Sequence, residues 1–385
     1  MLLKIMTRAV RVPVLSVIYA LMALTFSSAL QAAVPGYQRS FENFVGREIA
    51  PMVPGVAVVM VDQGKISRVR TWGRRNIDRK ARVTPDTVFR LASVSKNFAA
   101  TAAGLLVEEG LLKWDTLVQT ALDDVRFKRD DYGQQLTLRH LLSHSTGLIP
   151  QAYTNLIEDN VPYRKVVKRL REVDFVCPPG RCYGYQNVVF SLAGDMIEAI
   201  SGKDYNTFVQ QRLLTPLKMN TASLGYKAFK AEKNRATPHI KIRKRWRPAR
   251  VLPTYYRISP AAGVNASIND MGQWLLAQLG QRPNVLSGRL LDSLQAPVIR
   301  NTRRQSHFRS HKLLGATWYG LGWRVFSFGP YQNFVYHGGW VKGSRAMMVF
   351  NRELQMGMVF LTNAETKLAR KVVFRFLDLY LKHKA

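Results

Sequence analysis

Strand patterns lie at both ends of this chain, and helical patterns fill its middle. Residues 56–61 and 67–72 read as two paired strands joined by a short turn. From Ser93 to about Gly280, apolar residues recur mostly at helical spacing. Strand patterns then return at residues 323–328, 334–336, 346–350 and 356–361. This order predicts the α/β (α+β) fold class, in which an antiparallel sheet is flanked by helices and interrupted by an inserted, mainly helical domain.

The same order sets the domain boundaries that we expect. At 385 residues and 47% hydrophobic content, the chain can bury a large core in one or two tightly joined domains. We assign residues 34–90 and 290–385 to the sheet domain and residues 91–289 to the helical domain. Residues 365–384 predict a closing helix with an apolar face. An active site is expected at the junction of the two domains.

The first 33 residues resemble a targeting segment. Lys4, Arg8 and Arg11 form a basic start, and residues 12–30 are apolar apart from serines and one threonine. Small residues within 27–29 and 31–33 offer cleavage sites, so we expect a signal peptide and a periplasmic or secreted protein. Without cleavage, this segment would anchor the protein in the inner membrane, because its apolar run approaches the ~20 residues that span a bilayer.

The chain has two cysteines, Cys177 and Cys182, on either side of a Pro-Pro-Gly-Arg sequence. An exported protein meets oxidising conditions, and a Pro-Pro-Gly turn can bring the two ends together. We therefore expect a disulfide, which would stiffen the approach to Tyr185, three residues further on. We expect no metal site, because two cysteines without nearby paired histidines do not complete a tetrahedral ligand set.

One S-x-x-K motif, Ser93-Val94-Ser95-Lys96, stands where a strand-like run gives way to helical spacing. Residues three apart on a helix lie roughly 5–6 Å apart on one face, so the amine of Lys96 can reach the hydroxyl of Ser93. The positive potential of a helix N-terminus also disfavours a charged Lys96 and leaves an amine able to accept a proton. The alternative is that Ser93 only caps the helix and that Lys96 is solvated.

Two further motifs could complete a site. Tyr185-Gln186-Asn187 directly precedes a helical run at residues 188–200, where a phenol can carry a proton if nearby cations lower its pKa. The alternative for Asn187 is an ordinary helix cap. His337-Gly338-Gly339 ends a strand-like run, and two glycines there let a substrate backbone approach closely. The alternative for these three residues is an ordinary turn.

Together the three motifs resemble those of the serine hydrolase family that includes class C β-lactamases, D-aminopeptidases, DD-peptidases and related esterases. Similar segments extend the resemblance over roughly residues 53–380. The resemblance implies that Ser93 is the acylated nucleophile, Lys96 its proton acceptor and Tyr185 the group that protonates the leaving group. It also implies substrate-binding residues, with Asn187 steadying Lys96 and the substrate amide, as follows: Asn187, His337, Gly338, Gly339 and Trp340.

In that family the backbone N–H groups equivalent to those of Ser93 and Trp340 would form the oxyanion hole, and His337 would lie beside the substrate carboxylate or leaving group. Class C β-lactamases carry lysine where this chain has His337. The resemblance therefore implies an exported serine hydrolase without a cofactor, acting on peptidoglycan-type D-peptides or D-amino-acid amides first, small esters second and β-lactams third. The alternatives are a genuine β-lactamase and a catalytically idle protein of the same fold that binds anionic envelope components.

A net charge of +32 calls for an explanation. One basic patch surrounds Trp246, and it contains Lys241, Arg243, Lys244, Arg245 and Arg247; a second contains Arg300, Arg303, Arg304, Arg309 and Lys312. No nucleic-acid motif accompanies them, so we expect no specific nucleic-acid partner. The expected partners are a small-molecule or peptide substrate and, through the patches, anionic lipids or envelope polymers. The alternative is a general basic bias with solvated surfaces.

Overall fold

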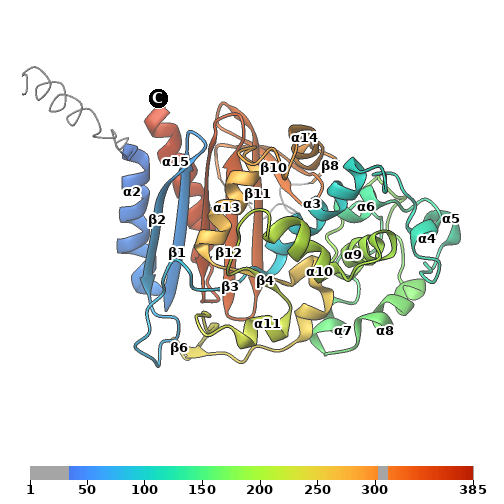
Figure 1. Ribbon diagram of the computed structural model, residues 1–385, viewed down its shortest axis with the longest axis horizontal. Helices are drawn as coiled ribbons and strands as arrows, with labels where there is room; N and C mark the ends of the chain where they lie inside the picture. The colour runs from blue at the N-terminus through green and yellow to red at the C-terminus, as the bar shows by residue number, and fades with distance from the viewer. Residues whose placement is uncertain (1–33, 302–310, 385) are drawn as a thin grey trace, which may run out of the picture. The chain divides into compact units, whose positions relative to one another are not determined.

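An eight-stranded antiparallel sheet organises the computed structural model (Figure 1). Its strand order is β2-β1-β13-β12-β11-β10-β9-β8, so the first two strands of the chain join the last six. The strands are β1 (Gly55–Asp62), β2 (Lys65–Gly73), β8 (Ile299–Arg300), β9 (Leu314–Tyr319), β10 (Arg324–Phe328), β11 (Tyr331–Val341), β12 (Ser344–Asn351) and β13 (Met356–Thr362). The predicted fold class, with strands from both ends of the chain in one antiparallel sheet, is confirmed.

The structure describes residues 34–301 and 311–384. Contacts divide the chain into two units, Met1–Pro35 and Gly36–Ala385, and the strands and helices of the fold belong to the second unit. The division of this unit at residues 91 and 289 stays a prediction. The expected signal peptide, residues 1–33, lies outside the described residues. Within the described ranges, no helix is long and apolar enough to cross a membrane.

The side chains on the two faces of the sheet pack into two separate hydrophobic cores, because successive strand residues point to opposite faces. On one face, Val58 and its neighbours pack against α2 (Gly36–Phe44) and α15 (Leu368–Lys384) (Figure 1). On the other face, Val59 and its neighbours pack with α13 (Ile268–Gln278) and the remaining helices. The sheet is therefore covered on both faces.

Residues 92–295 supply most of the helices. They are α3 (Ser95–Glu108), α4 (Val118–Ala121), α5 (Asp130–Gly133), α6 (Leu138–Leu142), α7 (Thr154–Glu158), α8 (Tyr163–Lys168), α9 (Val188–Ser201), α10 (Tyr205–Val209), α11 (Tyr226–Ala231), α12 (Ser259–Ala262), α13 and α14 (Gly288–Gln295). Two small antiparallel sheets accompany them: β3 (Phe89–Arg90) with β7 (Val264–Ala266) and β4 (Ser223–Leu224), and the hairpin of β5 (His239–Ile242) and β6 (Arg245–Pro248).

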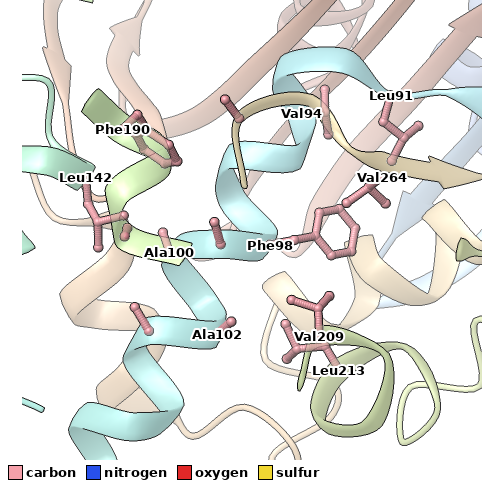
Figure 2. Packing of buried hydrophobic residues seen from close by; sticks show 14 of the residues in the cluster. Leu91, Val94, Phe98, Ala100, Ala102, Leu142, Phe190, Val209, Leu213 and Val264 are labelled. Carbon is pink, nitrogen blue, oxygen red and sulfur yellow. The ribbon is translucent and has the colours of Figure 1, made fainter. Parts of the chain in front are cut away.

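Helix α3 is buried on nearly every side, which makes it the rigid centre of this region. Figure 2 shows it passing between Phe190 of α9 and a pair of residues at and beyond the end of α10, Val209 and Leu213. Phe98 of α3 stacks on Trp274 of α13, with ring centroids 3.8 Å apart. Because α13 also packs against β1 and β13, this stack ties α3 to the sheet. Any side chain at the start of α3 is therefore held in a fixed position.

Strand β11 is longer than its sequence pattern predicts. His337, Gly338 and Gly339 were expected to follow the end of the strand, but they lie inside it and pair with Met348, Met347 and Ala346 of β12. That expectation was wrong, and so is the alternative of an ordinary turn. A Cβ on Gly339 would lie 2.0 Å from the carbonyl oxygen of Leu91, so only glycine lets β11 pass this close to the segment before α3.

The expected disulfide between Cys177 and Cys182 is present. Its loop is fastened to the segment after α6 by backbone hydrogen bonds, among them Gly180 N to Ser145 O at 2.7 Å and Gly184 N to His144 O at 2.8 Å. The disulfide and these bonds together fix the chain immediately before Tyr185.

Candidate active site

Ser93 lies in a short 3₁₀ turn, Ala92–Val94, that connects β3 to α3. Ala92 has a φ of +50°, a conformation that costs free energy for a residue with a side chain. Neither the turn nor α3 has a side-chain cap, so Ser93 does not act as a helix cap. Its hydroxyl instead lines a hollow of about 600 Å³.

Lys96 is fully buried, not solvated. Its Nζ donates hydrogen bonds to Asn187 Oδ1 (2.7 Å), Ala261 O (3.3 Å) and Ser93 Oγ (3.4 Å). Among the described residues, no carboxylate forms an ion pair with it. Burial, helped by the positive charge of Arg324, holds the pKa of Lys96 well below its usual range. A neutral amine beside a hydroxyl is the arrangement that general-base activation of a serine requires.

Tyr185 also meets Ser93, because the two side chains are hydrogen-bonded. The sequence made a proton-carrying role conditional on nearby cations that lower the pKa of Tyr185. Burial instead raises the pKa of Tyr185, and this outweighs the opposing effects of the Ser93 hydrogen bond and of Arg324. The phenol is therefore protonated at neutral pH.

Asn187 occupies the N-cap position of α9, but its side chain makes no capping hydrogen bond. The oxygen of its amide accepts from Lys96, and its nitrogen donates to Gln151 Oε1 at 2.9 Å. These two bonds orient the amide, since they use its acceptor and its donor at once. The structure thus brings together the predicted residues Ser93, Lys96, Tyr185 and Asn187.

The His337-Gly338-Gly339 segment contributes to the same site in a different way from the one expected. Gly338 and Trp340 line the hollow, with the Trp340 side chain 56% exposed at its rim. His337 is buried and is not one of the described residues that line the hollow. Its Nε2 lies 2.8 Å from the hydroxyl of Tyr319, so His337 contacts the site through a neighbouring side chain.

The pattern did not predict a role for Arg324, on β10. Its side chain is 4% exposed, lines the hollow, and lies within 6 Å of three tyrosine rings: Tyr183 (5.8 Å), Tyr185 (5.7 Å) and Tyr319 (5.3 Å). Its Nε and Nη1 atoms have no hydrogen-bond partner among the described residues. A buried arginine without a carboxylate is rare, because leaving the charge unpaired is costly. The detectable signal was a charged residue inside the apolar run of residues 323–326.

Several histidines lie outside the three motifs, among them His144 and His307. His144 is buried, packs against the Tyr185 ring (centroids 4.2 Å apart) and accepts a hydrogen bond from Gln186 N. Burial is the main cause that holds its pKa well below the usual range, so its ring is neutral. His307 lies outside the described residues. Within the described part of the chain, no three histidine, cysteine, aspartate or glutamate side chains gather closely enough to hold a metal ion.

The model of the Beta-lactamase family matches residues 39–380. The chain belongs to the Beta-lactamase family. Among curated proteins it is similar to Protein flp of Staphylococcus aureus strain NCTC 8325 / PS 47, with 23% identity over 86% of this chain and 64% of Flp. It is also similar to the Unguisins hydrolase ungD' of Aspergillus campestris, with 26% identity over 61% of this chain and 46% of that protein. The chain thus spans less than two thirds of these relatives.

A solved structure supports the fold assignment of this Beta-lactamase-family chain. The octameric penicillin-binding protein homologue from Pyrococcus abyssi matches 90% of this chain and 77% of its own, with a TM-score of 0.79 and 23% identity. The family that the three motifs indicated, and the fold it implies, are therefore confirmed.

Proposed function

We propose that this Beta-lactamase-family protein is an exported serine hydrolase that cleaves an amide or ester through an acyl-enzyme. The observation that carries the proposal is the buried amine of Lys96, which has no carboxylate partner among the described residues and lies 3.4 Å from Ser93 Oγ. A structural lysine would be paired or exposed, because burying an unpaired ammonium is costly. For a lysine that accepts a proton, the same burial is favourable, because it lowers the pKa of the amine and so leaves the amine neutral.

In the proposed acylation, Ser93 Oγ bonds to the substrate carbonyl carbon while its proton passes to Lys96 Nζ. The backbone N–H groups of Ser93 and Trp340 receive the oxyanion. The bond to the leaving group then breaks, the leaving atom takes the phenolic proton of Tyr185, and Lys96 returns its proton to Tyr185. A water molecule hydrolyses the acyl-enzyme by the same transfers in reverse and restores Ser93.

Arg324 points to the class of substrate. A buried guanidinium that lines the hollow and has no ion pair with a carboxylate among the described residues is suited to attract a carboxylate of the substrate. D-Peptides of the peptidoglycan type and D-amino-acid derivatives that end in a carboxylate therefore rank first, neutral esters second and β-lactams third. His337, which stands where class C β-lactamases have lysine, supports the low rank of β-lactams.

Export and the partners of the basic surface belong to the same proposal. The Cys177–Cys182 disulfide supports a periplasmic or secreted location, since such bonds persist under oxidising conditions. The β5–β6 hairpin exposes Lys241, Arg243, Lys244, Arg245 and Arg247. These charges would attract anionic lipids or envelope polymers by long-range electrostatics. Of the second basic patch, Arg303, Arg304 and Arg309 lie outside the described residues.

The deciding experiment is labelling with a fluorophosphonate and with a fluorescent penicillin, followed by mass mapping of the modified peptide. We expect Ser93 to carry the label and Ser93→Ala to abolish both labelling and turnover with a nearly unchanged melting temperature. Ser293→Ala, which removes a serine of α14, is the matched control. Labelling that persists in folded Ser93→Ala would overturn the proposal, and a folded wild-type protein that takes up neither reagent and hydrolyses nothing would favour the idle, anion-binding alternative.

A further inference from the structure

A second hollow, of about 580 Å³, adjoins the first. The two share four wall residues, which are Glu158, Tyr255, Trp340 and Val341. Ser93, Tyr185 and Arg324 line the first hollow alone, whereas Arg90, Arg250 and Lys342 line the second alone. The two hollows therefore form one cleft that continues past Trp340 and bears a separate set of cations at its far end.

The two carboxylates in the second hollow are already engaged. Glu158 accepts a hydrogen bond from the Tyr255 hydroxyl. Glu365 accepts from the indole nitrogen of Trp340 at 3.2 Å and from the backbone of Gly343 at 3.1 Å.

None of the ion pairs between described residues includes the three cations of this hollow, Arg90, Arg250 or Lys342. Its wall therefore carries an excess of positive charge that favours an anionic ligand.

Arg90 is the fixed member of this set of cations. It lies on β3, three residues before Ser93, and its side chain is 7% exposed. Its guanidinium lies 5.1 Å from the ring centroid of Tyr256 and is hydrogen-bonded to that side chain. The Tyr256 hydroxyl in turn donates to Asn265 Oδ1 at 2.6 Å. The charge is therefore positioned before any ligand arrives, which lowers the entropic cost of binding.

We propose that the second hollow is a subsite for a carboxylate on the acyl part of an elongated substrate, an inference that rests on the proposed function. Tyr185, which protonates the leaving group, and Arg324 both line the first hollow only. The leaving group therefore lies on their side of the scissile bond, and the acyl part extends past Trp340. The preferred substrate is then a peptide-like molecule with one carboxylate on each side of the bond that is cut.

The test compares two substrates that differ only in this charge, glutaryl-D-alanine p-nitroanilide and its terminal-amide counterpart, glutaramoyl-D-alanine p-nitroanilide. We expect wild type to prefer the glutaryl compound in kcat/KM by about fivefold or more, the range for a few partly exposed ion pairs. Arg250→Gln/Lys342→Gln should reduce this preference to less than about twofold and leave kcat/KM for the amide compound unchanged. Equal rates in wild type, or an undiminished preference in the double variant, would overturn the subsite.

A matched control separates local binding from long-range attraction. Arg243→Gln/Lys244→Gln also removes one arginine and one lysine charge, but from the β5–β6 turn, and neither of these residues lines either of the two hollows. The control should keep the preference; if it loses it equally, the effect is general steering and the subsite is wrong.

A binding measurement separates failure of the subsite from failure of the proposed function. Calorimetric titration of Ser93→Ala with glutaryl-D-alanine and with glutaramoyl-D-alanine requires no turnover. Tighter binding of the glutaryl compound that depends on Arg250 and Lys342 supports the subsite even if neither nitroanilide is cut. Equal affinities for the two compounds contradict it even if both are cut.

Discussion

Lys96 Nζ and Asn187 Oδ1 are joined by a 2.7 Å hydrogen bond between α3 and the N-cap of α9, across 91 positions of the sequence. The acceptor is a neutral amide, not a carboxylate, so it orients the amine without stabilising its positive charge as an anion would. Two different features therefore set the two properties of the amine: the hydrogen bond to Asn187 fixes its position, and burial lowers its pKa.

Replacing that amide oxygen by a carboxylate should reverse this arrangement. In Asn187→Asp, a negative charge beside Lys96 raises the pKa of the amine, because an opposite charge favours the charged form. We expect the rate of Ser93 acylation to fall at neutral pH and its rise with pH to move to higher pH. Asn187→Ala is the control: it should lower the rate without that shift. Stopped-flow acylation between pH 5 and 10 distinguishes the two, and an unshifted profile in Asn187→Asp would count against Lys96 as the base.

Lys96→Met should stabilise the fold in a pH-dependent manner. Since burial lowers the pKa of Lys96, the unfolded state binds the extra proton at pH values between the lowered pKa and about 10.4, so wild-type stability rises with pH in that window. The advantage of the methionine variant is largest below the lowered pKa and shrinks by about 1.4 kcal/mol per pH unit through the window. Urea unfolding of both proteins at pH 7 and pH 9 measures the difference. A difference independent of pH would mean that Lys96 titrates normally.

Arg324→Gln should weaken the binding of substrates that end in a carboxylate. Removing one partner of a buried charge-assisted pair costs about 2–5 kcal/mol, so we expect KM for a D-alanine-terminated peptide to rise by roughly 30-fold or more. A neutral ester should lose much less. Arg324→Lys keeps the charge but not the planar, two-pronged geometry and should lie between the two. Equal losses for both substrates would show that Arg324 serves the fold and not the substrate.

Loss of the disulfide should act mainly on the Tyr185 segment. Chain entropy for so short a loop predicts a loss of about 2 kcal/mol of unfolding free energy in Cys177→Ser/Cys182→Ser. We expect kcat to fall by a larger fraction than the free energy of unfolding, because the disulfide fixes the chain just before Tyr185. Reduced wild type provides the matched comparison. Full activity in the folded double variant would leave the bond a stabilising role only.

The sequence predicted the parts of this site that are encoded locally. The S-x-x-K spacing placed Lys96 one turn after Ser93, and the disulfide followed from two cysteines around a turn. The meeting of Ser93 with Tyr185 came from a family resemblance, since no local pattern reports a contact between residues so far apart.

The features of the site that the sequence did not predict depend on which side chains are buried. The role of Tyr185 was made conditional on cations that lower its pKa, whereas burial raises that pKa, and burial was not visible in the sequence. Arg324 was missed because a single charge in a strand pattern resembles a solvated edge residue, whereas β10 directs it inward. The end of β11 was misplaced at the glycines because glycine normally weakens a strand, and the close approach of Leu91 was not visible.

The pairing of β1 with β13 has a consequence for the timing of synthesis. Val56 pairs with Thr362, so these two strands meet only after all the residues between them have been made. Ser93 emerges early, but Arg324 and Trp340 are translated late, and contacts of such long range form slowly. Under the proposed mechanism, a nascent chain thus carries its nucleophile without an oxyanion hole or an anion receptor, and it gains hydrolytic activity only once β13 is in place.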